Sequence, residues 1–149
     1  MLGNSIIRIP PIQIPFFWEV IKQTVVQADE VEVKDRPFYF NSLLHSLLND
    51  KSQCFVRLNE EKRLLALMIT KIAIDKITGD KSLSIQNLYS WKMVDDKEWQ
   101  NDFLFFRSFA KKEDCKYVSF ESRNPRVWQL GELAGFREKS RMFSLTLGV

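Results

Sequence analysis

Three carboxylates stand close together in "DDKEWQ", residues 95–100, directly before a stretch with helical periodicity. Asp95 and Glu98 have the spacing of a capping box. Acidic side chains are also favoured at a helix N-terminus, where the helix dipole is positive. The segment therefore predicts a capped helix. Recognition of a cationic partner by the same acids is the alternative interpretation.

Other side chains with potential chemistry are few and far apart. Cys54 and Cys115 fit neither a metal-binding spacing nor a disulfide framework, so both are expected to be buried thiols. The single histidine, His45, lies in "FNSLLHSLL" and is expected to be a partly exposed helix residue. The chain carries no phosphate-binding glycine loop, no zinc-binding spacing and no nucleophile elbow. No metal site is predicted.

The composition is that of a globular domain. The chain has 149 residues, of which 45% are hydrophobic and 28% charged, and this length suits one domain. No apolar run reaches the roughly 18 residues that would cross a bilayer. The N-terminus is broken by prolines and lacks the apolar core of a signal peptide. We therefore expect a cytoplasmic-type protein without a membrane span.

The C-terminal third is mildly basic. Residues 103–149 carry 9 Lys and Arg against 5 Asp and Glu, whereas the whole chain has a net charge of +3. The basic residues there include a cluster flanked by two aromatic side chains: Arg123, Arg126, Arg137, Lys139 and Arg141, with Trp128 and Phe143. Interleaved acids favour an ordinary solvated face. Contact with a nucleic-acid backbone is the weaker alternative.

Prolines divide the N-terminal part of the chain. Residues 1–14 form an extended arm, and the alternation in "IIRIPPIQI" suits an edge strand or an arm on a surface. One domain is then predicted over 15–149. Pro15 suits the first turn of a helix that continues through "FFWEVIKQTVVQA", with Phe17, Ile21, Val25 and Ala28 on one face. A second helix is predicted through "FYFNSLLHSLLND".

The remaining elements alternate between strand and helix patterns. Strands are predicted in "QCFVRL", "RLLALMITKIAI" and "SLSIQNLYSWKM", and a helix follows in "DDKEWQNDFLFFRSFAKK". A strand in "KYVSFES", a helix in "PRVWQLGELA" and a closing strand in "EKSRMFSLTL" complete the chain. This order predicts an α/β fold with one mixed (α+β) sheet covered on both faces.

The order of elements, together with the tail of the chain, resembles the GNAT superfamily of N-acetyltransferases. The resemblance rests on Asn124, Leu130, Gly135 and Phe136, whose spacing follows the family pattern without gaps, and on "LSIQNLYSWKM" as its fourth strand. It covers about residues 38–147. It implies a V-shaped mixed sheet and, in active members, acetyl-CoA as the acyl donor.

The first departure from the family pattern lies in the pyrophosphate loop. The family places glycines at the start of the central helix, where backbone N–H groups hold the pyrophosphate of CoA. The corresponding positions here are occupied by Asp95, Asp96, Glu98 and Gln100, and no glycine occurs between Gly79 and Gly131. Two like unit charges about 4 Å apart repel by about 4 kcal/mol at an effective dielectric constant near 20. We therefore expect no cofactor.

The second departure is Gly131, which stands where the family often has a tyrosine that protonates the leaving thiolate. A glycine has no proton to donate. Tyr89 and Tyr117 are weak substitutes, because core packing is the expected role of both. Glu121, at the end of a strand, is a weak candidate for a general base, and a solvated carboxylate is its simpler interpretation.

Two missing functional positions predict a degenerate GNAT-like domain that acts as a protein-interaction or structural module. A protein partner or a homo-oligomer is expected. Because similar degenerate domains occur among virion-associated proteins of short-tailed phages, a virion-associated location is implied by analogy. The alternative is a divergent N-acyltransferase that binds acetyl-CoA through the strand backbone at Leu88 and Ser90 and through Asn124. The second alternative is a nucleic-acid-associated accessory protein.

Overall fold

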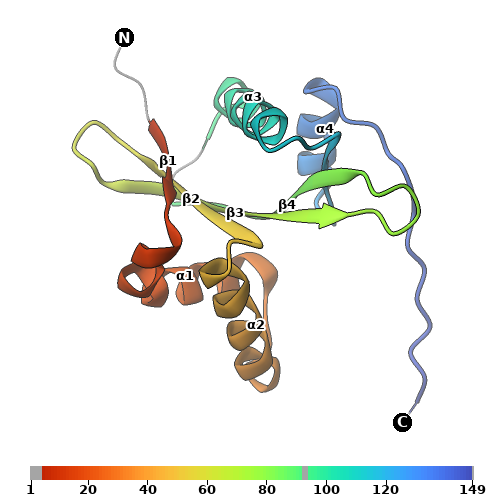
Figure 1. Cartoon of the computed structure of the whole chain (residues 1–149), viewed down its shortest axis with the longest axis horizontal. Coiled ribbons are helices and arrows are strands. Elements are labelled where there is room, and N and C mark those ends of the chain that lie inside the picture. Colours follow the sequence, from red (N-terminus) through yellow and green to blue (C-terminus); the bar gives the residue numbers. More distant parts are fainter. Residues whose placement is uncertain (1–4, 92–93, 149) are drawn as a thin grey trace.

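A computed structural model describes residues 5–91 and 94–148 of the chain and shows a mixed sheet with helices on both faces (Figure 1). This confirms the predicted α+β architecture. The elements are β1 (Ser5–Ile9), α1 (Ile14–Asp29), α2 (Arg36–Leu48), β2 (Ser52–Leu58), β3 (Leu64–Ile74), β4 (Lys81–Ser90), α3 (Asp96–Lys112), β5 (Tyr117–Phe120) and α4 (Pro125–Leu133). Two single-turn 3-10 helices, Pro11–Gln13 and Val33–Asp35, precede α1 and α2.

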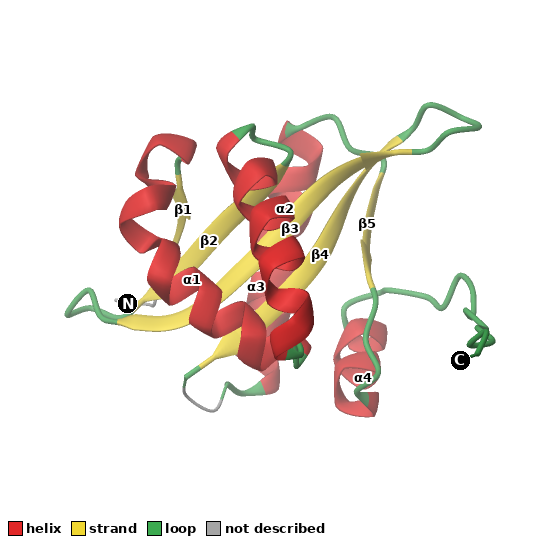
Figure 2. Cartoon of the chain, turned by 90° about the horizontal axis from the view of Figure 1, so that it is seen from below, coloured by secondary structure: helices red, strands yellow, loops and turns green. Residues whose placement is uncertain are grey.

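The strands follow the sheet order β1-β2-β3-β4-β5. β1 to β4 are antiparallel, so residues 5–9 of the expected arm form an edge strand of the sheet. β5 runs parallel to β4 and pairs only with Ser82–Ile85. Beyond that point the two strands diverge (Figure 2), and within residues 5–91 and 94–148 no strand pairs with residues 86–90 of β4 on the β5 side. A register shift between β3 and β4 lies just before this divergence.

The sheet is apolar on both faces because successive strand residues point to opposite sides. In β2, Cys54 and Val56 join a core beneath α1 and α2, whereas Phe55 joins a second core beneath α3 and α4. In β3, Ile69 joins the core beneath α1 and α2, and Met68 joins the core beneath α3 and α4. A continuous apolar strand is expected where helices cover both faces. Figure 1 shows this arrangement, with α1 and α2 on one face and α3 and α4 on the other.

The N-terminal helices follow their predicted positions closely. Pro15 lies in the first turn of α1, as expected, because the missing N–H of proline costs no hydrogen bond there. The buried face of α1 includes Ile21 and Val25, but Phe17 is 38% exposed, so its predicted place in the core is wrong. The core face is instead completed by Ile14, three residues before Phe17.

The closing strand predicted in residues 138–147 is absent. None of residues 137–148 belongs to a helix or strand, and the apolar side chains there lie in solvent. An alternating pattern gives a segment one apolar face, but a strand also needs a neighbouring edge with free backbone groups. The pattern alone does not determine whether such an edge is within reach.

Of the two thiols, only Cys54 is fully buried, and its burial raises the pKa of the thiol to about 12. Cys115 lies in the turn before β5 and is half-buried, so its predicted burial is only partial. Burial also raises the pKa of this thiol.

Candidate functional site

The N-terminus of α3 is closed by its own side chains. Asp95 is the N-cap residue, and its Oδ1 accepts a hydrogen bond from the backbone N–H of Glu98 at 2.8 Å. The predicted cap is therefore confirmed. The Glu98 carboxylate faces Arg57 on β2, with Oε2 3.9 Å from Nη1. A carboxylate thus occupies a position where backbone N–H groups would otherwise be available to an anion.

A buried ion pair lies one turn further along α3. Arg57 is 3% exposed and Asp102 is 4% exposed, and the two side chains form a salt bridge. Desolvation lowers the pKa of the Arg57 guanidinium, and the nearby Glu98 carboxylate acts in the opposite direction. The pair attaches α3 to β2 through charges inside an otherwise apolar layer. Removing only one partner would leave the other charge buried and uncompensated.

The third acid of the predicted segment links two helices. Asp96 in the first turn of α3 forms a salt bridge with Arg126 in the first turn of α4. Asn124 is the N-cap residue of α4, and its Oδ1 accepts from the backbone N–H of Arg126 at 2.9 Å. The two helix N-termini are therefore adjacent, and their polar groups bind one another. Gln100 follows in α3 as a half-buried side chain.

The space beside Gly131 is filled by an aromatic ring. A Cβ atom added at Gly131 would lie 2.5 Å from Cζ of Phe120 on β5, closer than any stable contact. The Phe120 ring is itself held by Phe103 of α3 and by Phe136, with centroid separations of 6.1 and 5.0 Å. A tyrosine therefore cannot replace Gly131 without displacing this cluster. The glycine has a packing role at this position.

The remaining catalytic candidates do not converge on one point. Tyr89 is half-buried and packs edge-to-face against Trp91 at a centroid distance of 5.1 Å. Tyr117 is 49% exposed, so its predicted place in the core is wrong. Glu121 is exposed beyond the end of β5. The proposed roles of these residues in catalysis stay predictions.

The three cofactor candidates lie on β4 and at the start of α4. Leu88 and Ser90 are in the part of β4 that β5 does not cover, and the Ser90 hydroxyl donates to the Leu65 carbonyl at 3.3 Å. Asn124 caps the neighbouring helix. Residues 86–89 of β4 lie beyond Ile85, the last residue that pairs with β5. Cofactor binding by these residues stays a prediction.

Part of the basic cluster is neutralised within the chain. Arg126 pairs with Asp96, and Arg141 pairs with Glu138 at 3.2 Å. The Trp128 indole donates to the Ser122 carbonyl at 2.6 Å. These contacts fit the predicted solvated face. Binding of nucleic acid stays a prediction.

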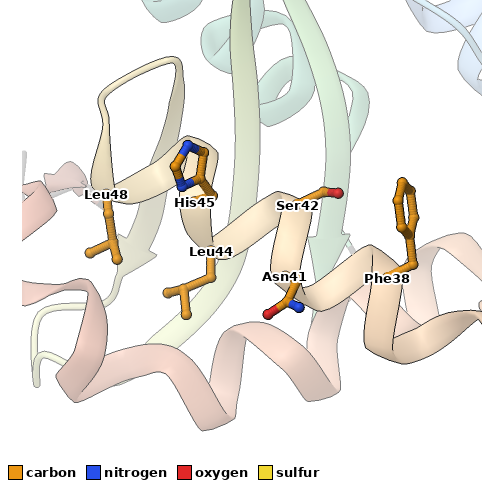
Figure 3. Close-up of a pocket in the computed structure, with 6 residues that line it drawn as sticks. All are labelled: Phe38, Asn41, Ser42, Leu44, His45 and Leu48. Carbon is orange, nitrogen blue, oxygen red and sulfur yellow. The ribbon is translucent and has the colours of Figure 1, made fainter.

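A shallow hollow lies elsewhere, along α2 (Figure 3). All of its lining residues belong to that helix: Phe38, Asn41, Ser42, Leu44, His45 and Leu48. His45 is exposed there, as predicted, and its Nε2 lies 3.1 Å from the Asn49 side-chain nitrogen. Because α2 and α3 cover opposite faces of the sheet, this hollow is separate from the α3 N-terminus (Figure 1).

Residues 5–91 and 94–148 contain no cluster of three metal-ligating side chains. In the same part of the chain, no helix is both long and apolar enough to cross a membrane.

Sequence reasoning missed two features of this region. The first is the Arg57–Asp102 pair, and the second is the contact of Phe120 with Gly131. The Arg57–Asp102 pair could have been suspected from the sequence, because Asp102 lies on the apolar stripe of α3 between Trp99 and Phe106. A charge on a buried stripe requires a partner. The contact of Phe120 with Gly131 leaves no such pattern in the sequence, because it depends on how β5 packs against α4.

Replacing Asp95 by alanine is expected to lower the free energy of unfolding by about 1 kcal/mol, because an N-cap hydrogen bond is lost. Asp95→Asn is the matched control, since asparagine caps equally well without a charge. Urea denaturation of both variants measures the difference. Equal losses in the two variants would show that charge, not the hydrogen bond, stabilises this end of the helix.

Solved structures similar to this chain establish its fold. No family model matches the sequence, and no curated protein matches it at a significant level. Similar solved structures include the aminoglycoside 6'-N-acetyltransferase of Acinetobacter baumannii, at a TM-score of 0.70, 10% identity and 99% coverage of both chains. An aminoglycoside N-acetyltransferase in complex with CoA gives a TM-score of 0.72 at 10% identity, over 99% of this chain and 96% of that one.

A third similar structure is an aminoglycoside acetyltransferase from an uncultured soil metagenomic sample, in complex with sisomicin. It gives a TM-score of 0.70 at 14% identity, with 97% of each chain covered. Other matched structures are described only as acetyltransferases. At these identities the likeness establishes the architecture and no activity. The chain has the fold of the GNAT acetyltransferases.

Proposed function

We propose that this chain is a GNAT-fold domain that does not use acetyl-CoA and acts as a protein-interaction or structural module. The observation that carries the proposal is the closed N-terminus of α3, where the Asp95 carboxylate binds the Glu98 N–H. Asp96 and Glu98 add two further carboxylates to the same turn. Each acid already has a cationic or N–H partner within the chain.

A pyrophosphate at this helix end would meet unfavourable electrostatics. A helix N-terminus attracts an anion through its free N–H groups and its dipole. Here the chain's own carboxylates use that attraction, and they repel a second anion by about 4 kcal/mol per pair of unit charges about 4 Å apart. Arg57 and Arg126 offset only part of this repulsion, because these two guanidinium groups stand against four carboxylates, those of Asp95, Asp96, Glu98 and Asp102.

The surroundings of Gly131 support the same proposal independently. The family position that often supplies a general acid holds a residue without a side chain, and Phe120 fills the adjacent space. Loss of a general acid typically costs a factor of about 10²–10⁴ in rate.

An interaction role is supported by large apolar side chains that the fold leaves in solvent. Phe16 on α1 is 85% exposed, and Ile12, one helical turn earlier, is 82% exposed. Together with Val20 they are spaced four residues apart and form an apolar stripe along α1 and the 3-10 helix that precedes it. Contiguous exposed apolar surface of this kind is typical of protein contacts.

A divergent N-acyltransferase is the second candidate function. The observation in its favour is the open stretch of β4, residues 86–90, beside which β5 has already ended. A further point is that one of the structures sharing the fold is described in complex with CoA. Under this alternative, acetyl-CoA would bind along Leu88 and Ser90, near Asn124, without a pyrophosphate loop.

Thermal denaturation with millimolar acetyl-CoA distinguishes the two functions. We expect no change in Tm, because a ligand raises Tm only if it binds the folded state. ATP at the same concentration is the control for unspecific anion binding. A rise in Tm with acetyl-CoA but not with ATP would overturn the proposal.

A charge-neutralised variant makes the test sharper. Asp95→Asn with Glu98→Gln removes two carboxylates and keeps the N-cap oxygen. If repulsion at α3 is what excludes the cofactor, acetyl-CoA should stabilise this variant more than the unmodified chain. If acetyl-CoA changes the Tm of the two proteins equally, the carboxylates at α3 are not what prevents acetyl-CoA from binding.

A further inference from the structure

The outward side of α3, here called the α3 face, carries cations and no acid. The period of 3.6 residues per turn places Phe103, Phe106 and Ala110 against the sheet and eight other residues on the opposite half of the helix. Seven of the eight are exposed and Gln100 is half-buried: Lys97, Gln100, Asn101, Leu104, Arg107, Ser108, Lys111 and Lys112. Four of these residues are Lys or Arg and none is Asp or Glu, so the α3 face has a formal charge of +4.

The three acids of α3 all pair with arginines from other elements. Asp96 pairs with Arg126 of α4, whereas Glu98 and Asp102 both pair with Arg57 of β2. Within the described part of the chain, no carboxylate forms an ion pair with any of the four cations of α3. The positive charge of the α3 face is therefore not neutralised by the helix's own acids.

The helix dipole accounts for only part of this pattern. Lys111 and Lys112 lie in the last turn of α3, where the dipole favours a cation. Lys97 lies in the first turn, where the dipole disfavours a cation, and Arg107 lies more than one turn before the helix ends. Stabilisation of the helix therefore does not explain why all four cations share one face.

The opposite side of the molecule has the reverse charge. Residues 14–48, which contain α1, α2 and their connector, carry 3 Lys and Arg against 5 Asp and Glu. These helices cover the face of the sheet opposite to α3 (Figure 1). An asymmetry of this kind orients a protein in the field of a polyanion, and here it turns α3 toward the negative charge.

The residue types on the α3 face are those of a surface that binds nucleic acid. Three of its four cations are lysines, and lysine and serine are depleted in protein–protein interfaces, whereas protein–DNA interfaces are strongly positive. Gln100, Asn101 and Ser108 add side chains of the kind that donate hydrogen bonds to phosphate and sugar. Leu104 is the one large apolar side chain of the face, which is too little for an apolar interface core.

The geometry of the α3 face suits a duplex better than a single strand. Lys97 and Lys111 lie about 21 Å apart along the helix axis, the length of about six base pairs. The face contains no aromatic residue, because Phe105 and Phe109 turn inward and pack on Phe55 of β2. Stacking on unpaired bases, the usual basis of single-strand binding, is therefore not offered by this face.

B-form DNA is also the duplex that a helix face can approach most closely. Its major groove is about 12 Å wide and admits a helix, so side chains reach the phosphates along the groove. The major groove of an RNA duplex is deep and narrow.

We propose that the α3 face binds the phosphate backbone of duplex DNA through Lys97, Arg107, Lys111 and Lys112, without reading base sequence. Backbone contacts fix a protein on the duplex and carry no sequence information directly. The surface is distinct from the basic cluster of residues 123–141, none of which lies on α3. The inference goes beyond the protein-interaction role and does not rest on the absence of acetyl-CoA chemistry.

Fluorescence anisotropy with a short, labelled DNA duplex of random sequence tests the proposal. We expect the full chain to bind at about 50 mM salt and to lose affinity steeply toward about 200 mM. Four phosphate contacts predict a slope of log K against log salt of about −3 to −4. Absence of binding at the lower salt concentration, or a slope near zero, would overturn the proposal.

Two quadruple variants with the same net charge locate the surface. The first replaces the cations of α3: Lys97→Gln, Arg107→Gln, Lys111→Gln and Lys112→Gln. The control replaces four exposed lysines elsewhere: Lys34→Gln, Lys51→Gln, Lys71→Gln and Lys76→Gln. We expect the α3 variant to bind at least about tenfold more weakly than the control and its salt slope to approach zero, because each phosphate contact contributes about one unit of slope. Equal affinities of the two variants would overturn the assignment to α3.

A double variant keeps the test valid if loss of the last-turn cations unfolds α3. Lys97→Gln with Arg107→Gln leaves Lys111 and Lys112 in place, so the favourable charge at the C-terminus of the helix is retained. The salt slope of this variant is expected to decrease in magnitude by about two. An unchanged slope would contradict contact of these two side chains with phosphate.

Three other polyanions distinguish duplex DNA from its competitors at equal charge concentration. Single-stranded DNA of the same length, an RNA duplex and polyglutamate are each expected to bind more weakly than the DNA duplex. Tighter or equal binding of the single strand or of the RNA duplex would overturn the assignment to duplex DNA. Equal binding of polyglutamate would show that the α3 face fits an acidic protein, and the proposal would then be wrong.

Discussion

Replacing Asp102 by alanine is expected to lower the free energy of unfolding by about 3–5 kcal/mol, the cost of leaving a buried charge without its partner. The partner is Arg57 of β2, which is only 3% exposed. Glu98 compensates this charge only weakly, because its Oε2 lies 3.9 Å from the guanidinium and its side chain is partly solvated. Urea denaturation with an unchanged m-value measures the loss.

Two further variants separate burial from charge. Asp96→Ala breaks an exposed pair on the same helix and is expected to cost about 1 kcal/mol or less. Arg57→Met combined with Asp102→Leu removes both charges, and it should recover most of the stability that Asp102→Ala loses. If Asp102→Ala costs no more than Asp96→Ala, the Arg57–Asp102 pair is solvated in solution and the account of α3 docking is wrong.

Replacing Phe106 by alanine is expected to cost about 3–5 kcal/mol, through lost transfer free energy and the cavity left behind. Phe106 is fully buried on α3 and packs edge-to-face on Phe55 of β2 at a centroid distance of 5.4 Å. Phe105 packs on both rings, with centroid separations of 5.5 Å to Phe55 and 5.4 Å to Phe106. The loss should appear as a lower urea midpoint.

Leu104→Ala is the control for this second substitution. Leu104 lies two residues away on the same helix and is 56% exposed, so its truncation should change the free energy of unfolding by less than about 1 kcal/mol. Phe106→Leu retains most of the buried volume and is expected to fall between the two. A Phe106→Ala variant as stable as Leu104→Ala would contradict the packing of α3 on β2.

The helices and strands that pack into the core were predictable because their local patterns match what they bury. The period of α3 identified its apolar stripe, and the order of the helices and strands predicted a sheet covered on both faces. The capping role of Asp95 also followed from spacing alone, since a cap involves residues only three positions apart. These features depend on near neighbours in the chain.

Features that join distant segments were not predictable in the same way. Phe17 was placed in the core because helical spacing defines a face only to within about one residue. Residues 138–147 have a strand pattern, yet nothing in that pattern determines whether a strand edge is within reach for them to pair with. The Gly131 position was recognised, but the reason for the glycine, contact with Phe120, required knowledge of where β5 meets α4.

By itself, the sequence determined the order of the core elements, the apolar faces they bury and the acidic cap of α3, because these follow from periodicity and short-range hydrogen bonding. Only the tertiary structure decided that Arg57 and Asp102 neutralise one another inside the core and that Phe120 fills the space above Gly131. The tertiary structure also decided that β4 and β5 separate beyond Ile85 and that residues 137–148 form no strand. The physical reason is that charge pairing, ring packing and strand pairing act between atoms close in space, whatever their separation along the chain.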